Sequence, residues 1–60
     1  MNRVVEILMK RDGISEDEAR ALVRETRDEL IMLDNPFEAD EIIENYLGLE
    51  PDYLFDILNV

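Results

Sequence analysis

The chain contains no cysteine and no histidine among its 60 residues. The absence of cysteine excludes disulfides, and the absence of both residues excludes thiolate or imidazole zinc sites and any cysteine–histidine or serine–histidine catalytic pair. A domain of this size buries only about 60% of the surface that its unfolded chain exposes, so its stability is marginal. The fold must therefore depend on efficient helix packing or on self-association.

Basic residues are missing from the second part of the chain. No lysine or arginine follows Arg27, although residues 28–60 carry ten carboxylates. The first 27 residues hold all six basic side chains and six acids, so the net charge of −10 lies beyond them. Like charges in a compact chain repel one another, and folding rarely requires such one-sided charge. The pattern indicates a surface for a basic partner, or a surface that repels nucleic acid.

Long apolar runs are also absent, since the longest covers only residues 30–33, far less than a membrane span. The first apolar run is broken by Glu6 and lacks the core and cleavage site of a signal peptide. At 47% hydrophobic residues, however, the chain is too apolar to be disordered. We expect a single helical domain over residues 1–60 that is soluble, cytoplasmic and without membrane contact.

Four helical segments are predicted from apolar spacing and capping residues. The first, residues 3–11, is followed by Gly13 as a stop signal. The adjacent β-branched residues Val4 and Val5 leave a short strand as the alternative for this segment. The helix would present one apolar stripe, made of Met1, Val4, Val5 and Leu8.

The second segment, about residues 15–33, is predicted to be the long helix. Ser15 and Glu18 have the spacing of a capping box, in which each side chain accepts from the other's backbone N–H. The helix should end before Pro36, since a residue that precedes proline avoids helical angles. Its predicted apolar face comprises Ala19, Leu22, Val23, Thr26, Leu30 and Leu33.

For the third helix, Asn35 is the predicted N-cap, Pro36 the first helical residue and Glu38 the third position of a second capping box. Gly48 should end the helix, with Leu49 folding back onto its apolar face in a Schellman motif. That face is predicted to comprise Phe37, Ile42, Ile43, Tyr46 and Leu47.

The fourth helix is predicted to start at Pro51 and is apolar around most of its circumference. Three short helices can cover only one side of it, so the remainder is expected to face a second copy or a partner. We expect a homodimer; the alternatives are a groove for a different partner and simple coverage of a small core by Tyr53 and Phe55. The predicted dimer interface comprises Leu54, Phe55, Ile57 and Leu58.

Neither catalysis nor a metal or cofactor site is expected. Outside tyrosine, the only hydroxyls belong to Ser15 and Thr26, which have structural roles. Catalytic carboxylate pairs need an apolar cleft that raises one pKa, and a chain of this length rarely builds one. No calcium-loop pattern occurs. The spaced glutamates of the third helix therefore indicate a solvated helix face rather than a metal site.

Direct nucleic-acid binding is not expected either. Arg20, Arg24 and Arg27 form one basic stripe on the second helix, but three charges cannot outweigh a net charge of −10 near phosphate. Glu16 and Asp28 also have the spacing to pair with Arg20 and Arg24. The stripe is therefore interpreted as a set of ion pairs, within this helix or across to the acidic third helix.

The acidic surface of the second part of the chain is the main candidate site. Carboxylates on a rigid helix can imitate a row of phosphates or steer a basic protein. Some of the acids are explained as residues that start helices, and plain solvation is the alternative. The predicted partner-binding residues are Glu38, Asp40, Glu41 and Glu44 for charge, with Tyr53 and Phe55 as apolar anchors.

Residues 47–58, Leu-Gly-Leu-Glu-Pro-Asp-Tyr-Leu-Phe-Asp-Ile-Leu, resemble the C-terminal signature of small acidic open reading frames of phages and prophages. In that family a helix beginning with residues like Ser-Glu-Asp-Glu-Ala, as at 15–19, precedes this ending. The resemblance covers about half of the chain. It implies a modulator or inhibitor of host machinery, in the manner of anti-defence proteins, acting in the host cytoplasm.

These observations together predict an all-α domain of three to four helices that binds and does not catalyse. The favoured function is a phage-type modulator that docks on a basic host protein. The alternatives are a mimic that occupies a DNA- or RNA-binding site, and a structural subunit whose acids only keep it soluble.

Overall fold

The computed structural model describes residues 2–60, and all regular structure in that range is helical. The predicted all-α class is therefore confirmed. Met1, which was placed on the first apolar stripe, lies outside the described residues. The elements in chain order are α1 (Arg3–Asp12), α2 (Glu16–Ile31), the 3₁₀ turn η1 (Pro36–Glu38), α3 (Ala39–Leu47), the 3₁₀ turn η2 (Pro51–Tyr53) and α4 (Leu54–Leu58).

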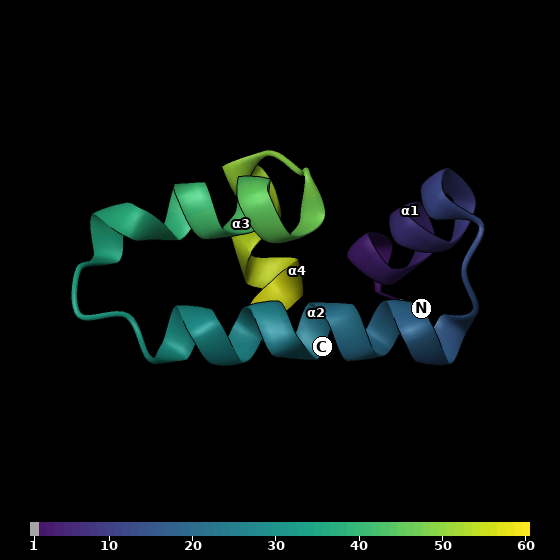
Figure 1. Ribbon diagram of the computed structural model, residues 1–60, viewed down its shortest axis with the longest axis horizontal. Helices are drawn as coiled ribbons and strands as arrows, with labels where there is room; N and C mark the ends of the chain where they lie inside the picture. The colour runs from purple at the N-terminus through teal and green to yellow at the C-terminus, as the bar shows by residue number, and fades with distance from the viewer. Residues whose placement is uncertain (1) are drawn as a thin grey trace.

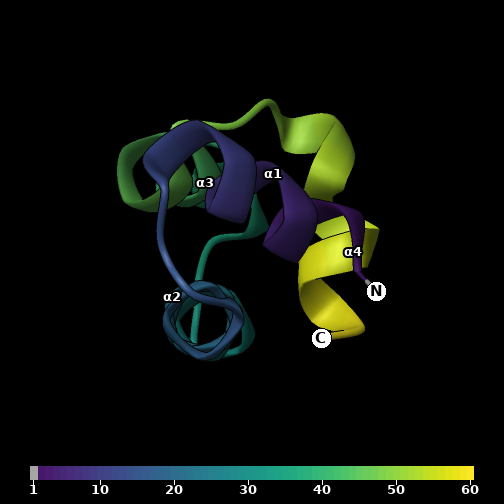
Figure 2. The same ribbon diagram turned by 90° about the vertical axis from the view of Figure 1, so that its right-hand side faces the viewer.

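The long helix α2 runs along the molecule, which measures 32 × 16 × 15 Å (Figure 1). Helices α1 and α3 pack along it towards opposite ends (Figure 1), and α4 lies beside it (Figure 2). Each of the other three helices contacts α2, and α4 also contacts α1. The four helices therefore share one core, formed by Val4, Val5, Leu8, Ala19, Val23, Ile43, Leu47 and Ile57, each at most 2% exposed.

Helix α1 begins at a side-chain cap. The Asn2 Oδ1 atom accepts hydrogen bonds from the N–H groups of Val4 (2.9 Å) and Val5 (3.4 Å). Such caps satisfy backbone donors that have no partner within the helix. The short strand considered for this segment is wrong, because the stripe of Val4, Val5 and Leu8 is buried as a helix face.

Helix α2 begins at Ser15, whose Oγ accepts from the Glu18 N–H at 3.2 Å. Within residues 2–60 only this half of the predicted capping box is formed, since the Glu18 carboxylate accepts no bond from Ser15. The helix ends at Ile31, two residues before the predicted end. On its apolar face the Thr26 hydroxyl is buried and donates to the carbonyl of Leu22, which itself is 39% exposed at the edge.

The start of α3 differs from the prediction. Asn35 Oδ1 accepts from the Phe37 N–H at 3.0 Å and begins a 3₁₀ turn, while Glu38 makes no capping bond. A 3₁₀ turn rotates about 120° per residue instead of 100°, so it changes which side chains face the core. Phe37, predicted on the apolar face, is consequently 89% exposed, and Tyr46 at the edge of that face is 47% exposed.

Helices α1 and α3 end in the same way. Gly13 (φ 65°) and Gly48 (φ 66°) adopt the left-handed conformation that glycine enters without steric cost. The Gly48 N–H donates to the Glu44 carbonyl at 2.8 Å. This single bond defines an αL ending in place of the predicted Schellman motif. Leu49 nevertheless packs against the core, as expected.

Helix α4 is covered on one side only. Ile57 is fully buried, whereas Phe55 is 73% exposed and Leu58 is 40% exposed. Tyr53 and Leu54 are partly buried against the core. The sequence-based expectation that the other helices would leave part of α4 uncovered is confirmed.

Candidate partner-binding site

The four acids predicted to contact a partner lie together on η1 and α3, and all are exposed: Glu38, Asp40, Glu41 and Glu44. We call these four residues the acidic face. The buried residues Ile43 and Leu47 fix the rotation of α3, which directs the acids away from the core. None of the four forms an ion pair within residues 2–60. Glu38, Asp40 and Glu41 lie in first turns, where the helix dipole favours negative charge, whereas the like-charged pair Asp40–Glu44 at i, i+4 costs about 0.2–0.5 kcal/mol.

Four of the six basic residues are engaged in ion pairs elsewhere. Four ion pairs occur in the described part of the chain: Arg3–Asp56, Arg11–Asp12, Arg20–Glu16 and Arg27–Asp28. The predicted pair of Glu16 with Arg20 is confirmed at 2.9 Å. The predicted pair of Arg24 with Asp28 is wrong, because Asp28 instead lies 3.5 Å from Arg27. None of these pairs reaches α3, so the acidic face is not neutralised from α2.

Two arginines contact helix ends through backbone carbonyls. Arg11 donates to the Gly48 carbonyl after α3 (3.4 Å), and Arg27 donates to the Val60 carbonyl after α4 (3.0 Å). Neither α3 nor α4 has a basic residue in its own last turn. The negative end of a helix dipole lies at the C-terminus, so these two arginines supply the favourable charge from other helices.

Hydrogen bonds shift the pKa values of three charged side chains. The bond to Asp56 raises the pKa of Arg3, and the bond to Asp12 raises the pKa of Arg11. Reciprocally, the bond from Arg11 lowers the pKa of Asp12. These groups are exposed ion-pair members, so their pKa shifts reflect structural contacts and give no indication of acid–base catalysis.

The predicted apolar anchors differ in their surroundings. Phe55 projects into solvent, as an anchor for a partner must. Tyr53 is partly buried, and the Arg3 guanidinium carbon lies 5.4 Å from the centre of its ring. This cation–π contact occupies one face of the ring. Ile57 is fully buried in the core and is therefore removed from the predicted dimer interface, while Leu54 is partly buried and Leu58 stays accessible.

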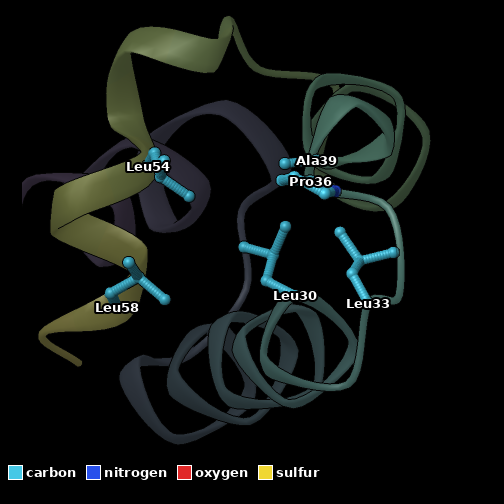
Figure 3. A pocket seen from close by; sticks show the side chains of 6 residues that line it. All are labelled: Leu30, Leu33, Pro36, Ala39, Leu54 and Leu58. Carbon is cyan, nitrogen blue, oxygen red and sulfur yellow. The ribbon is translucent and has the colours of Figure 1, made fainter.

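Sequence reasoning missed an apolar groove between α2, η1, α3 and α4 (Figure 3). Two leucines of its lining come from the C-terminal part of α2 and the connection after it, two residues from η1 and the start of α3, and two leucines from α4. Its volume is about 240 Å³. The lining residues are Leu30, Leu33, Pro36, Ala39, Leu54 and Leu58. Of these, Leu30 and Leu33 were predicted on the apolar face of the second helix, and Leu54 and Leu58 at a dimer interface.

The residue composition of the groove limits the chemistry that it can support. All six lining residues are apolar, so the groove holds no nucleophile, acid, base or metal ligand. Within residues 2–60 no group of three or more acidic side chains is placed to hold a metal ion. Apolar contact is the chemistry that the groove offers.

Three further apolar residues, all outside the predicted site, are strongly exposed near the connection between α2 and α3. They are Ile31 (67%), Met32 (77%) and Phe37 (89%). Each is a direct neighbour in the chain of a residue that lines the groove. Exposed apolar residues near one another are typical of interaction sites.

Among the described helices, none has the length and apolar character needed to cross a membrane. Comparison of the chain with protein-family models, with curated proteins and with solved structures gives no match. The resemblance to small acidic phage reading frames therefore stays an expectation, and functional inference depends on the surface described above.

Proposed function

We propose that this protein is a non-enzymatic interaction protein that docks on a basic partner protein through its acidic face. The supporting observation is that most acids of residues 28–60 are exposed and, in the described part of the chain, unpaired. Eight carboxylates there are exposed and form no ion pair within residues 2–60: Glu29, Asp34, Glu38, Asp40, Glu41, Glu44, Glu50 and Asp52.

The physical basis is electrostatic steering. Fixed charges of one sign attract an oppositely charged protein over a distance of about 8 Å at physiological ionic strength and raise the rate of association. Because the acids on α3 stand on a helix anchored in the core, they need no rearrangement before contact. Phe55 supplies exposed apolar area on α4.

The setting follows from the resemblance to small acidic phage reading frames. It favours a host protein as the basic partner, a modulating or inhibitory effect and action in the host cytoplasm. A basic host protein that binds nucleic acid would also be a target for a nucleic-acid mimic. The two forms of the proposal differ in one respect: a mimic competes with DNA or RNA for the partner, whereas a modulator binds alongside it.

The test of the acidic face uses a partner obtained by affinity capture and then purified. Replacing Glu41 and Glu44 by lysine should weaken binding at low salt by about tenfold or more. The matched control replaces Glu6 and Glu25, exposed acids on α1 and α2 that lie outside residues 28–60, by lysine and changes the net charge equally. Equal loss in both variants would indicate general charge attraction, and intact binding in the α3 variant would contradict docking through the acidic face.

Self-association through Phe55 of α4, which is 73% exposed and does not line the groove, is a second proposal. Sedimentation of the wild type should then show a dimer, and Phe55→Asp should shift it to a folded monomer. A folded monomer for both proteins would contradict the homodimer.

A further inference from the structure

We infer that the apolar groove between α2, α3 and α4 receives a large apolar side chain from a cationic amphipathic segment of the partner. This inference rests on the proposed function and deepens it, because it names the recognition element on the partner. The acidic face supplies attraction, and the groove supplies the contact that selects one segment among basic ones.

The dimensions of the groove favour a side chain as its occupant. Small-molecule sites usually measure about 300–1,000 Å³ and contain a few polar groups that orient the ligand. The groove measures about 240 Å³ and its lining has no polar side chain. A cavity of about 150 Å³ lined by aliphatic and aromatic residues already holds a benzene molecule. One leucine, methionine or phenylalanine side chain therefore suits this volume.

The walls of the groove match a helical ligand. Leu54 and Leu58 are four residues apart on α4, and Leu30 and Leu33 are three residues apart where α2 ends. The four leucines line opposite sides of the space in Figure 3. An amphipathic helix presents apolar residues at i, i+3, i+4 and i+7 on one face, so one of them can enter the groove while the others lie along its edges.

The charges beside the groove specify a cationic segment. Every charged residue adjacent in sequence to a lining residue is acidic, and none is basic: Glu29, Asp34, Glu38 and Asp40. All four are exposed and make no ion pair in the described part of the chain. Lysine or arginine residues that flank an apolar anchor would meet these carboxylates.

The same charges disfavour a second copy as the occupant. A second copy would bring its own net charge of −10 and the same four carboxylates to the contact. Like charges that face one another across an interface oppose association. Charge complementarity thus distinguishes a basic partner segment from a homodimer that buries Leu54 and Leu58 in the groove.

The experiment uses the full chain and three synthetic helical peptides. The first carries leucine at i, i+3, i+4 and i+7 with lysine elsewhere, the second has alanine for leucine, and the third has glutamate for lysine. Binding is measured by fluorescence anisotropy and mapped by amide chemical shifts. We expect the first peptide to bind with shifts at Leu33, Ala39 and Leu58. The second should bind about tenfold more weakly, as expected for losing a buried leucine, and the third should not bind.

A matched pair of variants separates the groove from charge. Ala39→Leu fills the groove and leaves all charges in place, and Ala21→Leu makes the same change at an exposed position of α2. Ala39→Leu should weaken binding of the leucine–lysine peptide about tenfold and leave the alanine–lysine peptide unaffected. Ala21→Leu should bind both peptides as the wild type does.

Three outcomes would overturn the inference. One is equal binding of the leucine and alanine peptides with shifts confined to the acidic face, which would leave the proposed charge docking intact. Another is unchanged binding by a folded Ala39→Leu. The third is a wild-type dimer that Ala39→Leu dissociates, without peptide binding, since the occupant would then be a second copy. Failure of the proposed function is read separately, from the lysine variants of Glu41 and Glu44 and the purified partner.

Discussion

Two parts of the molecule differ in how their charged side chains are paired: residues 2–31, which contain α1 and α2, and residues 32–60. We call them the first and the second part of the molecule. In α1 and α2, three arginines pair with acids one or four residues away in the chain. Residues 32–60 contain eight acids and no basic residue, and only Asp56 is paired, with Arg3 of α1. The second part is therefore held by its buried apolar residues and helix ends. Apart from Asp56, its acids form no ion pair in the described residues.

The two parts are also joined by hydrogen bonds from side chains of the first part to backbone carbonyls of the second. Arg11 and Arg27 reach the carbonyls of Gly48 and Val60, and Asn2 donates to the Asp56 carbonyl at 2.6 Å. These contacts place positive charge at the C-terminal ends of α3 and α4 without neutralising the acidic face. The first part thus stabilises the fold of the second and, within residues 2–60, leaves its acids other than Asp56 unpaired.

The largest expected effect on stability comes from truncating a buried core residue of α3. Ile43 of α3 is fully buried, and Ile43→Ala should lower the free energy of unfolding by about 2–5 kcal/mol, measured by chemical denaturation. Phe37→Ala is the control, because Phe37 is 89% exposed and its loss should change stability by less than about 0.5 kcal/mol. A large loss for Phe37→Ala would place that ring in the core and contradict the register of η1.

A matched pair of glycines compares the helix ends of the two parts. Gly13→Ala should cost about 1–2 kcal/mol, because alanine is strained in the left-handed conformation. Gly48→Ala should cost the same or slightly more, since its added methyl would lie 3.3 Å from the Arg11 guanidinium, a flexible side chain that can move. Both are measured by thermal unfolding. Stability unchanged in either variant would mean that its helix ends differently.

Salt should reveal the unpaired charge of the second part. Raising ionic strength from about 0.01 to 0.15 M shortens the Debye length from about 30 to 8 Å and should raise Tm, because it screens repulsion among the acids. Replacing Glu41 and Glu44 by glutamine should reduce this response. Glu16→Gln is the opposite control, since losing the pair with Arg20 should cost about 0.3–0.5 kcal/mol. A Tm that falls with salt would contradict repulsion as the dominant surface effect.

The smallest expected effect concerns Asp12, a paired acid of the first part. Its pKa is lowered by the hydrogen bonds from Arg11, so its contribution is complete above the ordinary carboxyl value of about 3.9 and is lost as pH falls through the lower folded value. Titration of the carboxyl by NMR should show this lowered pKa, and Arg11→Met should return it towards the ordinary value. A wild-type pKa at or above that value would contradict the pair.

Much of the fold could be predicted because its signals are local. The stop glycines Gly13 and Gly48 and the caps Asn35 and Ser15 act within a few residues, and each marks a boundary in the structure. The exposure of Phe37 was not predicted, because it depends on backbone geometry that residue spacing does not determine. The 3₁₀ turn after Asn35 changes the rotation of the chain, and a pattern read at 100° per residue therefore placed Phe37 in the core.

The candidate site divides in the same way. Exposure of the acidic face was predictable, since carboxylates rarely enter a core unpaired. The groove was not, because its six residues come from α2, the connection after it, η1, α3 and α4, which meet only in the folded chain. The partner of Asp28 was also undetermined, since spacing allows Arg24 and proximity allows Arg27.

The contacts of Asn2 and Arg3 with Asp56 join residues more than 50 positions apart. At a synthesis rate of about 5–20 residues per second, α1 is synthesised about 2–9 s before α4 is complete. Helices themselves form in microseconds or less, so α1 and α2 spend this interval without α4. Because Leu54 and Leu58 form one wall of the groove, a nascent chain lacks the groove until α4 has docked. Only the completed fold is therefore expected to bind a partner there.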